Sequence, residues 1–171
     1  KKLQDDAVVC VDVGQNQIFA CKYLPQKHGR LLTSGGLGTM GYALPAAIGA
    51  KVAQEKKQTV VVCGDGSFQM AMNELAAIRA SGMEIKIDRR VLFRSVLFQN
   101  NMLGLVHQIQ KSAPYHGPFG VALDGSPDFA EIAAAYGIPS LLADDEDKLD
   151  ETLDRFLETP GSMVLICKVH P

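Results

Sequence analysis

The sequence predicts an α/β fold: a doubly wound, mainly parallel sheet with helices on both faces. Short apolar runs rich in β-branched residues alternate with segments of helical period, which is the pattern of βαβ units. These runs are continuously apolar, as expected of strands that are buried on both faces. Polar or glycine-rich residues follow several of the runs directly, and open α/β sheets bind ligands at that edge.

Five runs are predicted to be strands: Ala7–Val11, Thr59–Cys63, Val96–Gln99, Ser140–Ala143 and Met163–Val169. Four segments have a helical pattern: Tyr42–Gln54, Ser67–Ala80, a segment from Ser126-Pro127-Asp128 to Gly137, and Glu146–Thr159. Ser67 and Ser126 are predicted to cap their helices, with Pro127 at the first helical position. Gly82 is predicted to stop the second helix.

Composition limits the classes of function. At 171 residues the chain is the size of one domain. The net charge of −2 gives no basic field for nucleic acid, and no apolar run is long enough to span a membrane. Four scattered cysteines without a CxxC pair indicate a reduced, cytoplasmic protein. A strand follows Lys1 almost at once, which indicates a fragment of a longer polypeptide.

The segment Gly64-Asp65-Gly66-Ser67, taken together with Asn100-Asn101, is the strongest candidate for a binding site. Both groups follow predicted strands, so a carboxylate and a carboxamide are expected at the same edge of the sheet. Mg²⁺ prefers oxygen ligands and often lies against phosphates, and a helix start offers free amides to a phosphate. The pattern predicts a metal clamp for a phosphorylated cofactor. A simple tight turn is the alternative for an aspartate between glycines.

Two further segments leave alternatives open. The glycine-rich loop at residues 34–41 could cradle phosphate or permit close packing, and its spacing matches neither the Walker pattern nor the dinucleotide fingerprint. Residues 12–17, Asp-Val-Gly-Gln-Asn-Gln, could bind phosphate oxygens through their amide side chains or form a polar turn.

The stretch Ile87–Ser95 does not fit a buried strand, because it carries three arginines. Burying a charged side chain without a partner costs on the order of several kcal/mol. Removal of residues 87–95 would join Met83–Lys86 to Val96–Asn101 as one uninterrupted strand. We interpret the stretch either as a looped-out natural insertion or as a foreign segment that resembles translated sequencing-adapter read-through.

Three segments together resemble the C-terminal cofactor-binding domain of the thiamine-diphosphate-dependent enzymes: residues 12–17, residues 33–41, and Gly64-Asp65-Gly66 with Asn100-Asn101. Residues 44–50, 127–129 and 135–137 look like the acetolactate (acetohydroxyacid) synthase branch. The resemblance covers nearly all of the chain except residues 87–95, and it implies that residues 1–171 form a single thiamine-diphosphate-binding domain. The Gly-Asp-Gly to Asn-Asn spacing is longer than the family's, and removal of those nine residues restores it.

The resemblance implies the following cofactor-binding residues: Gln15, Asn16, Gly38, Thr39, Met40, Asp65, Gly66, Ser67, Asn101, Leu103 and Gly104. Asp65, the Asn101 side chain and the Leu103 carbonyl would bind Mg²⁺. The catalytic candidates are Gly38, whose carbonyl would accept from the cofactor's 4′-amino group, and Met40, which would support the bent cofactor. Gln15, Asn16, Gly66 and Ser67 would contact the diphosphate, although many relatives have His at the position of Asn16.

The implied activity is that of a transferase of branched-chain amino acid biosynthesis. It decarboxylates a 2-keto acid such as pyruvate and ligates the product to a second 2-keto acid, while the cofactor supplies the carbanion chemistry. In this family an activating Glu comes from the pyrimidine-binding domain of a second subunit. The resemblance therefore implies a homodimer or tetramer and an inactive fragment, and it admits FAD, held by a middle domain, in the longer protein.

One departure concerns the substrate. Acetolactate synthases commonly carry Trp in an Arg-Gln-Trp-Gln run after the Asn pair, whereas this chain has His107-Gln108-Ile109-Gln110 and no Trp. The acceptor substrate is therefore open. Another thiamine-diphosphate-dependent decarboxylase or carboligase is an alternative, and so is a non-catalytic α/β binding module.

Overall fold

The apolar runs form a six-stranded parallel sheet in the computed structural model, which describes residues 2–24, 30–81, 93–112 and 117–170. The strand order is β2-β1-β3-β4-β6-β5. The strands are β1 (Val8–Val11), β2 (Arg30–Leu32), β3 (Thr59–Gly64), β4 (Phe93–Gln99), β5 (Ser140–Ala143) and β6 (Met163–Lys168). All five predicted strands are confirmed, and the short edge strand β2 was not predicted.

The helices are α1 (Gln15–Tyr23), α2 (Ala43–Ala53), α3 (Asp65–Ala71), α4 (Leu75–Ala80), α5 (Gly104–Ser112), α6 (Phe129–Ala135) and α7 (Leu149–Glu158), with 3₁₀ turns at Met72–Glu74 and Glu146–Lys148. The four predicted helical segments are confirmed. The segment predicted as Ser67–Ala80 consists of α3, a 3₁₀ turn and α4. Helices α1 and α5 were not predicted.

Both predicted serine caps are wrong. Helix α3 begins at Asp65, before Ser67, and its N-cap residue Gly64 has no capping side chain. Helix α6 is capped by Asp128, whose carboxylate accepts from Ala130 N at 2.8 Å and from Glu131 N at 3.1 Å. A carboxylate one residue before the helix reaches these free amides, whereas the Ser126 hydroxyl donates to Leu123 O. The predicted stop at Gly82 lies outside the described residues.

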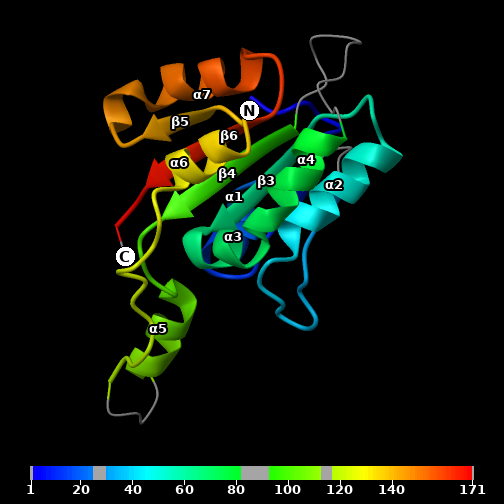
Figure 1. Ribbon diagram of the computed structural model, residues 1–171. Helices are drawn as coiled ribbons and strands as arrows, with labels where there is room; N and C mark the ends of the chain where they lie inside the picture. Colours follow the sequence, from blue (N-terminus) through cyan, green and yellow to red (C-terminus); the bar gives the residue numbers. More distant parts are fainter. Residues whose placement is uncertain (1, 25–29, 82–92, 113–116, 171) are drawn as a thin grey trace.

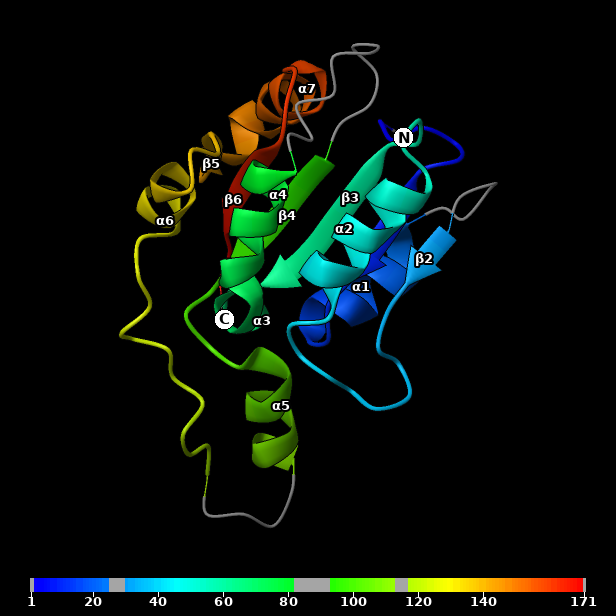
Figure 2. The same ribbon diagram turned by 45° about the vertical axis from the view of Figure 1, so that its right-hand side comes forward.

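Helices cover the two faces of the sheet unequally (Figures 1 and 2). On one face α2, α3, α4 and α6 pack on the strands and enclose the largest apolar core, which includes Phe68, Leu75, Leu97 and Phe129. On the other face α1 and α7 make two separate smaller cores, one around Ala20 and one around Phe156. Between α1 and α7 an apolar cavity of about 280 Å³ remains over the middle strands.

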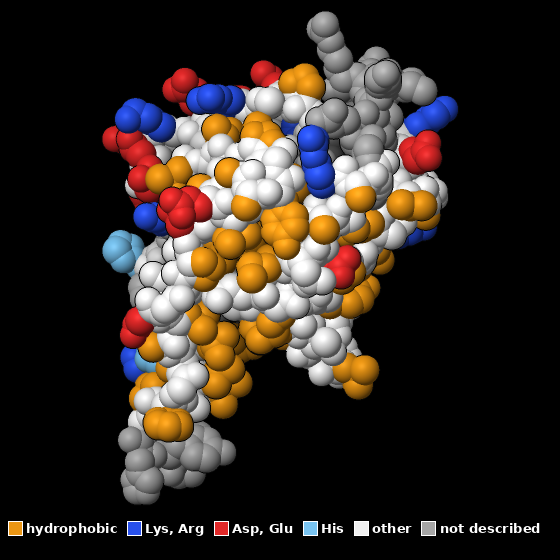
Figure 3. Space-filling model, viewed as in Figure 1, with side chains coloured by type: hydrophobic (Ala, Val, Ile, Leu, Met, Phe, Trp, Pro, Cys, Tyr) orange, Lys and Arg blue, Asp and Glu red, His pale blue; other side chains and the backbone are white. Residues whose placement is uncertain are grey.

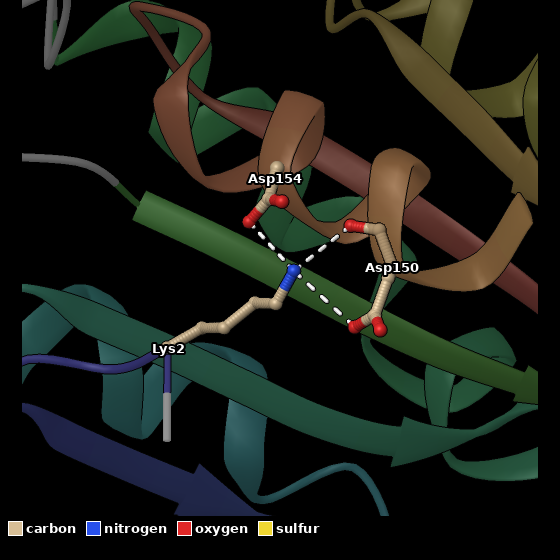
Figure 4. A network of polar contacts seen from close by, with 3 residues as sticks. All are labelled: Lys2, Asp150 and Asp154. Carbon is tan, nitrogen blue, oxygen red and sulfur yellow. Dashed lines mark hydrogen bonds and ion pairs between the residues drawn. The ribbon is translucent and has the colours of Figure 1, made fainter.

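The N-terminal residues run to the α7 side of this cavity. Lys2 lies against α7, where its Nζ donates to Asp154 Oδ1 at 2.7 Å and to the Asp150 main-chain oxygen at 3.0 Å (Figure 4). Leu3 follows and contributes to the apolar lining of the cavity. The start of the chain is therefore held at the face of the sheet that carries fewer helices.

Helix α5 extends away from the sheet, at the edge where the strands end (Figures 1 and 2). None of its residues is buried, and Val106 and Ile109 are among the exposed apolar side chains. In the space-filling view, hydrophobic side chains gather on the lower part of the molecule where α5 meets the body (Figure 3). Among the helices in the described ranges, none has both the length and the apolar character needed to cross a bilayer.

Strand β4 begins within the stretch interpreted as an insertion. Phe93, Arg94 and Ser95 pair with Thr59–Val61 of β3, and Arg94 and Ser95 also pair with β6. The looped-out interpretation is therefore wrong for these three residues, because Phe93 pairs with β3 and the main chains of Arg94 and Ser95 complete the ladders of both neighbouring strands. Residues 87–92 lie outside the described residues, and the origin of the stretch is not tested by the fold.

The strand order places a topological switch beside β1. Helix α1 leads from β1 to β2 on one face, and α3 and α4 lead from β3 towards β4 on the other. Because β2 and β4 lie on opposite sides of the β1–β3 pair, the two connections diverge at the carboxyl ends of β1 and β3. Such a divergence opens a crevice, which is where α/β sheets bind ligands.

Candidate functional site

The carboxylate of Asp65 joins the ends of β3 and β4. The residue follows β3 directly and is 2% exposed. Its Oδ1 accepts from Gly66 N at 2.8 Å, and its Oδ2 accepts from Asn100 N at 3.0 Å and Asn101 N at 2.6 Å. Main-chain amides thus offset the cost of burying this charge. The predicted meeting of Asp65 with the Asn pair at one edge of the sheet is confirmed.

Asn101 turns the chain out of β4 towards α5. Its φ of 54° lies in the left-handed region, which Asn adopts more readily than most residues. Its Oδ1 accepts from Gln99 Nε2 at 3.1 Å, while the Asn100 side chain accepts from Met102 N at 3.1 Å. The neighbouring segment is held by Leu103 N, which donates to Val121 O at 2.8 Å.

The proposed magnesium ligands fit a hard cation in their chemistry. Asp65, Asn101 and Leu103 offer a carboxylate, an amide and a main-chain carbonyl oxygen, the donor types that Mg²⁺ takes. Asp65 Oδ1 and Asn101 Oδ1 each accept one hydrogen bond, and Leu103 O accepts from His107 N at 2.9 Å. Each of these oxygens therefore keeps a lone pair. Within the described ranges no group of three or more His, Cys, Asp or Glu residues is placed to hold a metal.

Ser67 lies in the first turn of α3 and is buried. Its hydroxyl donates to Val13 O at 3.2 Å and so connects α3 to the end of β1. Gly66, one residue earlier, has no room for a side chain, because a Cβ there would lie 2.8 Å from Leu103 Cδ2 and 3.2 Å from Met40 Cε. The side chains of Met40 and Leu103 therefore converge over the start of α3.

The amide side chains after β1 belong to the first turn of α1. The Gln15 carboxamide lies against the start of α5, where a Cβ on Gly104 would be only 2.1 Å from Gln15 Oε1. Asn16 Nδ2 donates to Asp12 O at 2.7 Å and to Val62 O at 3.4 Å. Asn16 thus connects β1 to β3 through both of its amide hydrogens, whereas the predicted diphosphate contact would use an amide hydrogen as donor.

The glycine-rich loop runs from β2 to α2 and needs glycine at two left-handed positions, Gly38 at φ 64° and Gly41 at φ 84°. A Cβ on Gly41 would also lie 3.1 Å from Met70 Cβ, so the loop passes close to α3. Gln17 Nε2 donates to Thr33 Oγ1 at 2.8 Å and holds the start of the loop beside α1.

A pocket of about 310 Å³ lies at these strand ends. Of the predicted site residues, the following line it: Gln15, Asn16, Met40, Asp65, Gly66, Ser67, Leu103 and Gly104. Asn100 lines the pocket, and the adjacent Asn101 is bonded to Asp65. Gly38 and Thr39 do not contribute to the lining and are exposed on the loop beside it.

Several lining residues were not predicted: Phe19, Phe98, Met102, Val106, Val169 and His170. Val169 and His170 directly follow β6, so the rule that ligands bind at strand ends could have identified them. Phe19 lies on α1, a helix that was not predicted.

The electrostatic field at this edge is negative. Asp12 and Asp65 are both buried at the ends of adjacent strands, β1 and β3. Burial raises the pKa of the Cys63 thiol well above its usual range, and the negative charges of Asp12 and Asp65 raise it further. A cation bound between the strand ends would be favoured by this field.

The fold and the site together define a cofactor-binding α/β domain, and sequence comparison identifies its class. Residues 12–167 match the family model for the C-terminal TPP-binding domain of thiamine pyrophosphate enzymes. The chain belongs to this family. The resemblance to the thiamine-diphosphate-dependent enzymes and the predicted thiamine-diphosphate-binding fold are thereby confirmed.

The chain is similar to large subunits of acetolactate synthases. It is 44% identical to the acetolactate synthase large subunit of Lactococcus lactis over 150 residues, which cover 83% of this chain and 25% of that protein. It is 36% identical to the large subunit of Cyanidium caldarium and 34% identical to that of isozyme 1 of Escherichia coli, with 98% of this chain covered in each case. The chain spans about a quarter of the length of these relatives.

Proposed function

We propose that this chain is the thiamine-diphosphate- and Mg²⁺-binding domain of an acetolactate-synthase-like transferase. In this proposal the longer protein decarboxylates a 2-keto acid, pyruvate, and ligates the product to a second 2-keto acid. The observation that carries the proposal is the Asp65 network, in which one buried carboxylate aligns Gly66, Asn100 and Asn101 around the pocket. Acetolactate synthase is also the printed name of the relatives.

Each group of residues has a part in this proposal. Asp65, the Asn101 side chain and the Leu103 carbonyl hold Mg²⁺. Gln15, Asn16, Gly66, Ser67 and Gly104 surround the diphosphate, while Gly38, Thr39 and Met40 contact the aminopyrimidine and thiazolium end. For Asn16, a diphosphate contact requires its carboxamide to give up a main-chain partner.

When bound, thiamine diphosphate supplies the stabilised carbanion that decarboxylation and carbon–carbon bond formation require. The chain's own residues position and shield it. Met40 and Leu103 converge over Gly66, and with the cofactor bound these two side chains would keep water from the space above the helix start. An apolar environment at that point favours loss of a charged carboxylate. The Gly38 carbonyl acts as the hydrogen-bond acceptor for the exocyclic amino group.

The proposal places the remaining functional groups on other parts of the longer protein. The activating Glu belongs to the pyrimidine-binding domain of a second subunit, so the active form is a homodimer or tetramer, cytoplasmic and engaged in branched-chain amino acid biosynthesis. FAD, where present, is held by a middle domain. The 171-residue chain alone is expected to be inactive, and acetolactate formation by it would contradict this expectation.

Isothermal titration calorimetry on the longer protein tests the metal site. With saturating Mg²⁺, Asp65→Asn is expected to weaken thiamine diphosphate binding at least about tenfold, because the carboxylate charge that faces the metal is lost. Asp128→Asn, an exposed change at the cap of α6, is the matched control and should leave affinity unchanged. Equal affinity of the Asp65→Asn and wild-type proteins would remove Asp65 from the metal site.

A sibling enzyme on the same cofactor is the second candidate, favoured by the His107-Gln108-Ile109-Gln110 run and the absence of Trp. Incubating the longer protein with pyruvate, alone and with 2-ketobutyrate, distinguishes the two. An acetolactate synthase forms acetohydroxy acids, whereas a simple decarboxylase releases acetaldehyde. A non-catalytic module would bind or ignore the cofactor without consuming pyruvate.

A further inference from the structure

Asp12, at the end of β1, is a second buried carboxylate beside the pocket. Asp12 is only 1% exposed to solvent. Oδ1 accepts from Val13 N at 2.9 Å and Gly41 N at 3.0 Å, and Oδ2 accepts from Ala43 N at 2.9 Å. In the described part of the chain all hydrogen-bond partners of the Asp12 carboxylate are main-chain amides. Charge-assisted bonds of this kind are roughly twice as strong as neutral ones.

Two of these three partners come from a distant segment. Gly41 ends the glycine-rich loop and Ala43 is the first residue of α2, and they follow Asp12 by 29 and 31 positions. Helix α2 has no capping side chain of its own, because the N-cap residue Tyr42 makes no such bond. The Asp12 carboxylate therefore serves as the cap of α2 from another strand, where its charge also suits the positive end of the helix.

The same bonds set the position of Met40. Met40 directly precedes Gly41, whose amide is bonded to Asp12. On its other side Gly41 packs against Met70 of α3. A Cβ placed on Gly41 would lie only 3.1 Å from the Met70 Cβ. The loop is thus held between β1 and α3, and the Met40 side chain is held over Gly66.

We propose that Asp12 is a positioning residue, which fixes the height of Met40 and Gly38 above the carboxyl ends of β1 and β3. The inference rests on the proposed function, in which Met40 and Gly38 meet the thiazolium and aminopyrimidine. It assigns separate tasks to the two buried carboxylates: Asp65 holds the metal and diphosphate end, and Asp12 holds the loop at the other end.

Amide hydrogen exchange on this 171-residue chain, without cofactor, tests the positioning itself. Asn at position 12 presents an N–H to one of its amide partners, so Asp12→Asn is expected to speed exchange at Gly41 and Ala43 about tenfold or more. Asp128→Ala removes a carboxylate that also caps a helix, through Ala130 and Glu131. This control should speed exchange in α6 and leave Gly41 and Ala43 protected. Unchanged protection of Gly41 and Ala43 in Asp12→Asn would overturn the proposal.

A second experiment on the longer protein, saturated with Mg²⁺ and thiamine diphosphate, tests the division of tasks. The exchange of the thiazolium C2 proton for deuterium is expected to slow about tenfold in Asp12→Asn, while the Kd of the cofactor changes less than about threefold. Asp65→Asn should show the opposite pattern, in which the Kd of the cofactor rises more than the C2 exchange slows. Equal losses of C2 exchange and affinity in the Asp12 variant would contradict positioning and indicate general destabilisation.

A failure of the proposed function can be distinguished from a failure of the Asp12 proposal. A wild-type protein that binds no thiamine diphosphate refutes the proposed function, whereas the amide exchange of the free chain tests Asp12 independently of any cofactor. If Asp12→Asn does not fold, Asp12→Glu keeps the charge and moves the carboxylate by one methylene. That variant should keep Gly41 and Ala43 protected and still slow C2 exchange, and wild-type C2 exchange in it would overturn the proposal.

Discussion

The two ends of β4 bury polar groups in opposite ways. At its carboxyl end, the Asn100 and Asn101 amides meet the Asp65 carboxylate, so that donor and charge compensate each other. At its amino end, Arg94 and Ser95 are fully buried between β3 and β6. The first arrangement belongs to the candidate site. The second lies in residues 87–95, the stretch interpreted either as a natural insertion or as a foreign segment.

Arg94 finds partial compensation. Its guanidinium donates to the main-chain oxygens of Thr159 and Gly161 and lies 5.3 Å from the centre of the Phe156 ring. Burial nevertheless lowers the pKa of Arg94 to about 10. The hydroxyls of Ser95 and of Thr59, on the neighbouring strand, are buried without a hydrogen-bond partner among the described residues. A buried polar group is stable in this sheet where main-chain donors converge on it, and costly where they do not.

The largest effect is expected from removing the carboxylate that meets the carboxyl end of β4. Asp65→Ala leaves the amides of Gly66, Asn100 and Asn101 buried without their acceptor, so we expect a loss of about 3–5 kcal/mol in the free energy of unfolding. Urea denaturation followed by circular dichroism measures it. Asp128→Ala, which removes an exposed cap, should cost only about 1 kcal/mol. Equal losses in the two variants would mean that the Asp65 carboxylate stabilises the chain no more than an ordinary exposed helix cap.

The next largest effect is expected at the amino end of β4. We propose that residues 87–95 are foreign to the domain, and that their deletion lets Glu84-Ile85-Lys86 take the places of Phe93–Ser95. Ile85 would then face Phe156 where Arg94 now lies, whereas Lys86 would take the place of the buried Ser95. The gain from removing the buried guanidinium is therefore partly offset, and the free energy of unfolding should rise by about 2 kcal/mol. Urea denaturation of the shortened chain measures the gain. A less stable deletion variant would contradict the proposal, and so would source DNA that retains these nine codons.

A smaller gain is expected from one side chain in that region. Arg94→Leu replaces a buried cation by an apolar group next to Phe156 and should stabilise the chain by about 1–2 kcal/mol. The change also withdraws two donors from the Thr159 and Gly161 oxygens at the end of α7. If thermal denaturation shows a lower melting temperature for Arg94→Leu, that capping role outweighs the cost of burying the charge.

The smallest effects come from a matched pair of serines. Ser95→Ala removes a buried hydroxyl that has no partner among the described residues and should gain about 1 kcal/mol. Ser67→Ala removes a buried hydroxyl bonded to Val13 O and should lose about 1 kcal/mol. Opposite signs in the same denaturation assay would support the contrast between the two ends, and equal signs would refute it.

Much of the fold was predictable because its strands are continuously apolar and its main helices carry an apolar stripe. The missed elements lack these signals. Strand β2 is only three residues long and begins with an exposed Arg30. Helix α1 buries Ala20 alone and exposes Phe19, and α5 buries nothing. Such helices are held by their place in the fold rather than by an apolar stripe, so periodicity cannot reveal them.

The candidate site was predictable to a similar extent. The strand-end rule brought Asp65 and Asn101 together, and the structure agrees. The same rule placed Asp12 at a strand end without giving it a task. Its partners Gly41 and Ala43 lie about thirty positions further along the chain. They donate through main-chain amides, which nearly every residue type has, so the sequence does not mark them as partners. Contacts between a side chain and a distant main chain emerge only from the folded geometry.

The parallel sheet also bears on the order in which the domain assembles. Every strand pair in the described part of the chain is parallel, so none of these pairs can form from a hairpin. The shortest connections join β1 to β2 and β5 to β6, at the two edges, while the β1–β3 and β4–β6 pairs join segments far apart in sequence. Loop closure delays such contacts in folding. Asp12, Asp65 and Asn101 follow β1, β3 and β4, and each of these strands takes part in one of the late pairs, so a formed pocket marks a chain whose central sheet is complete.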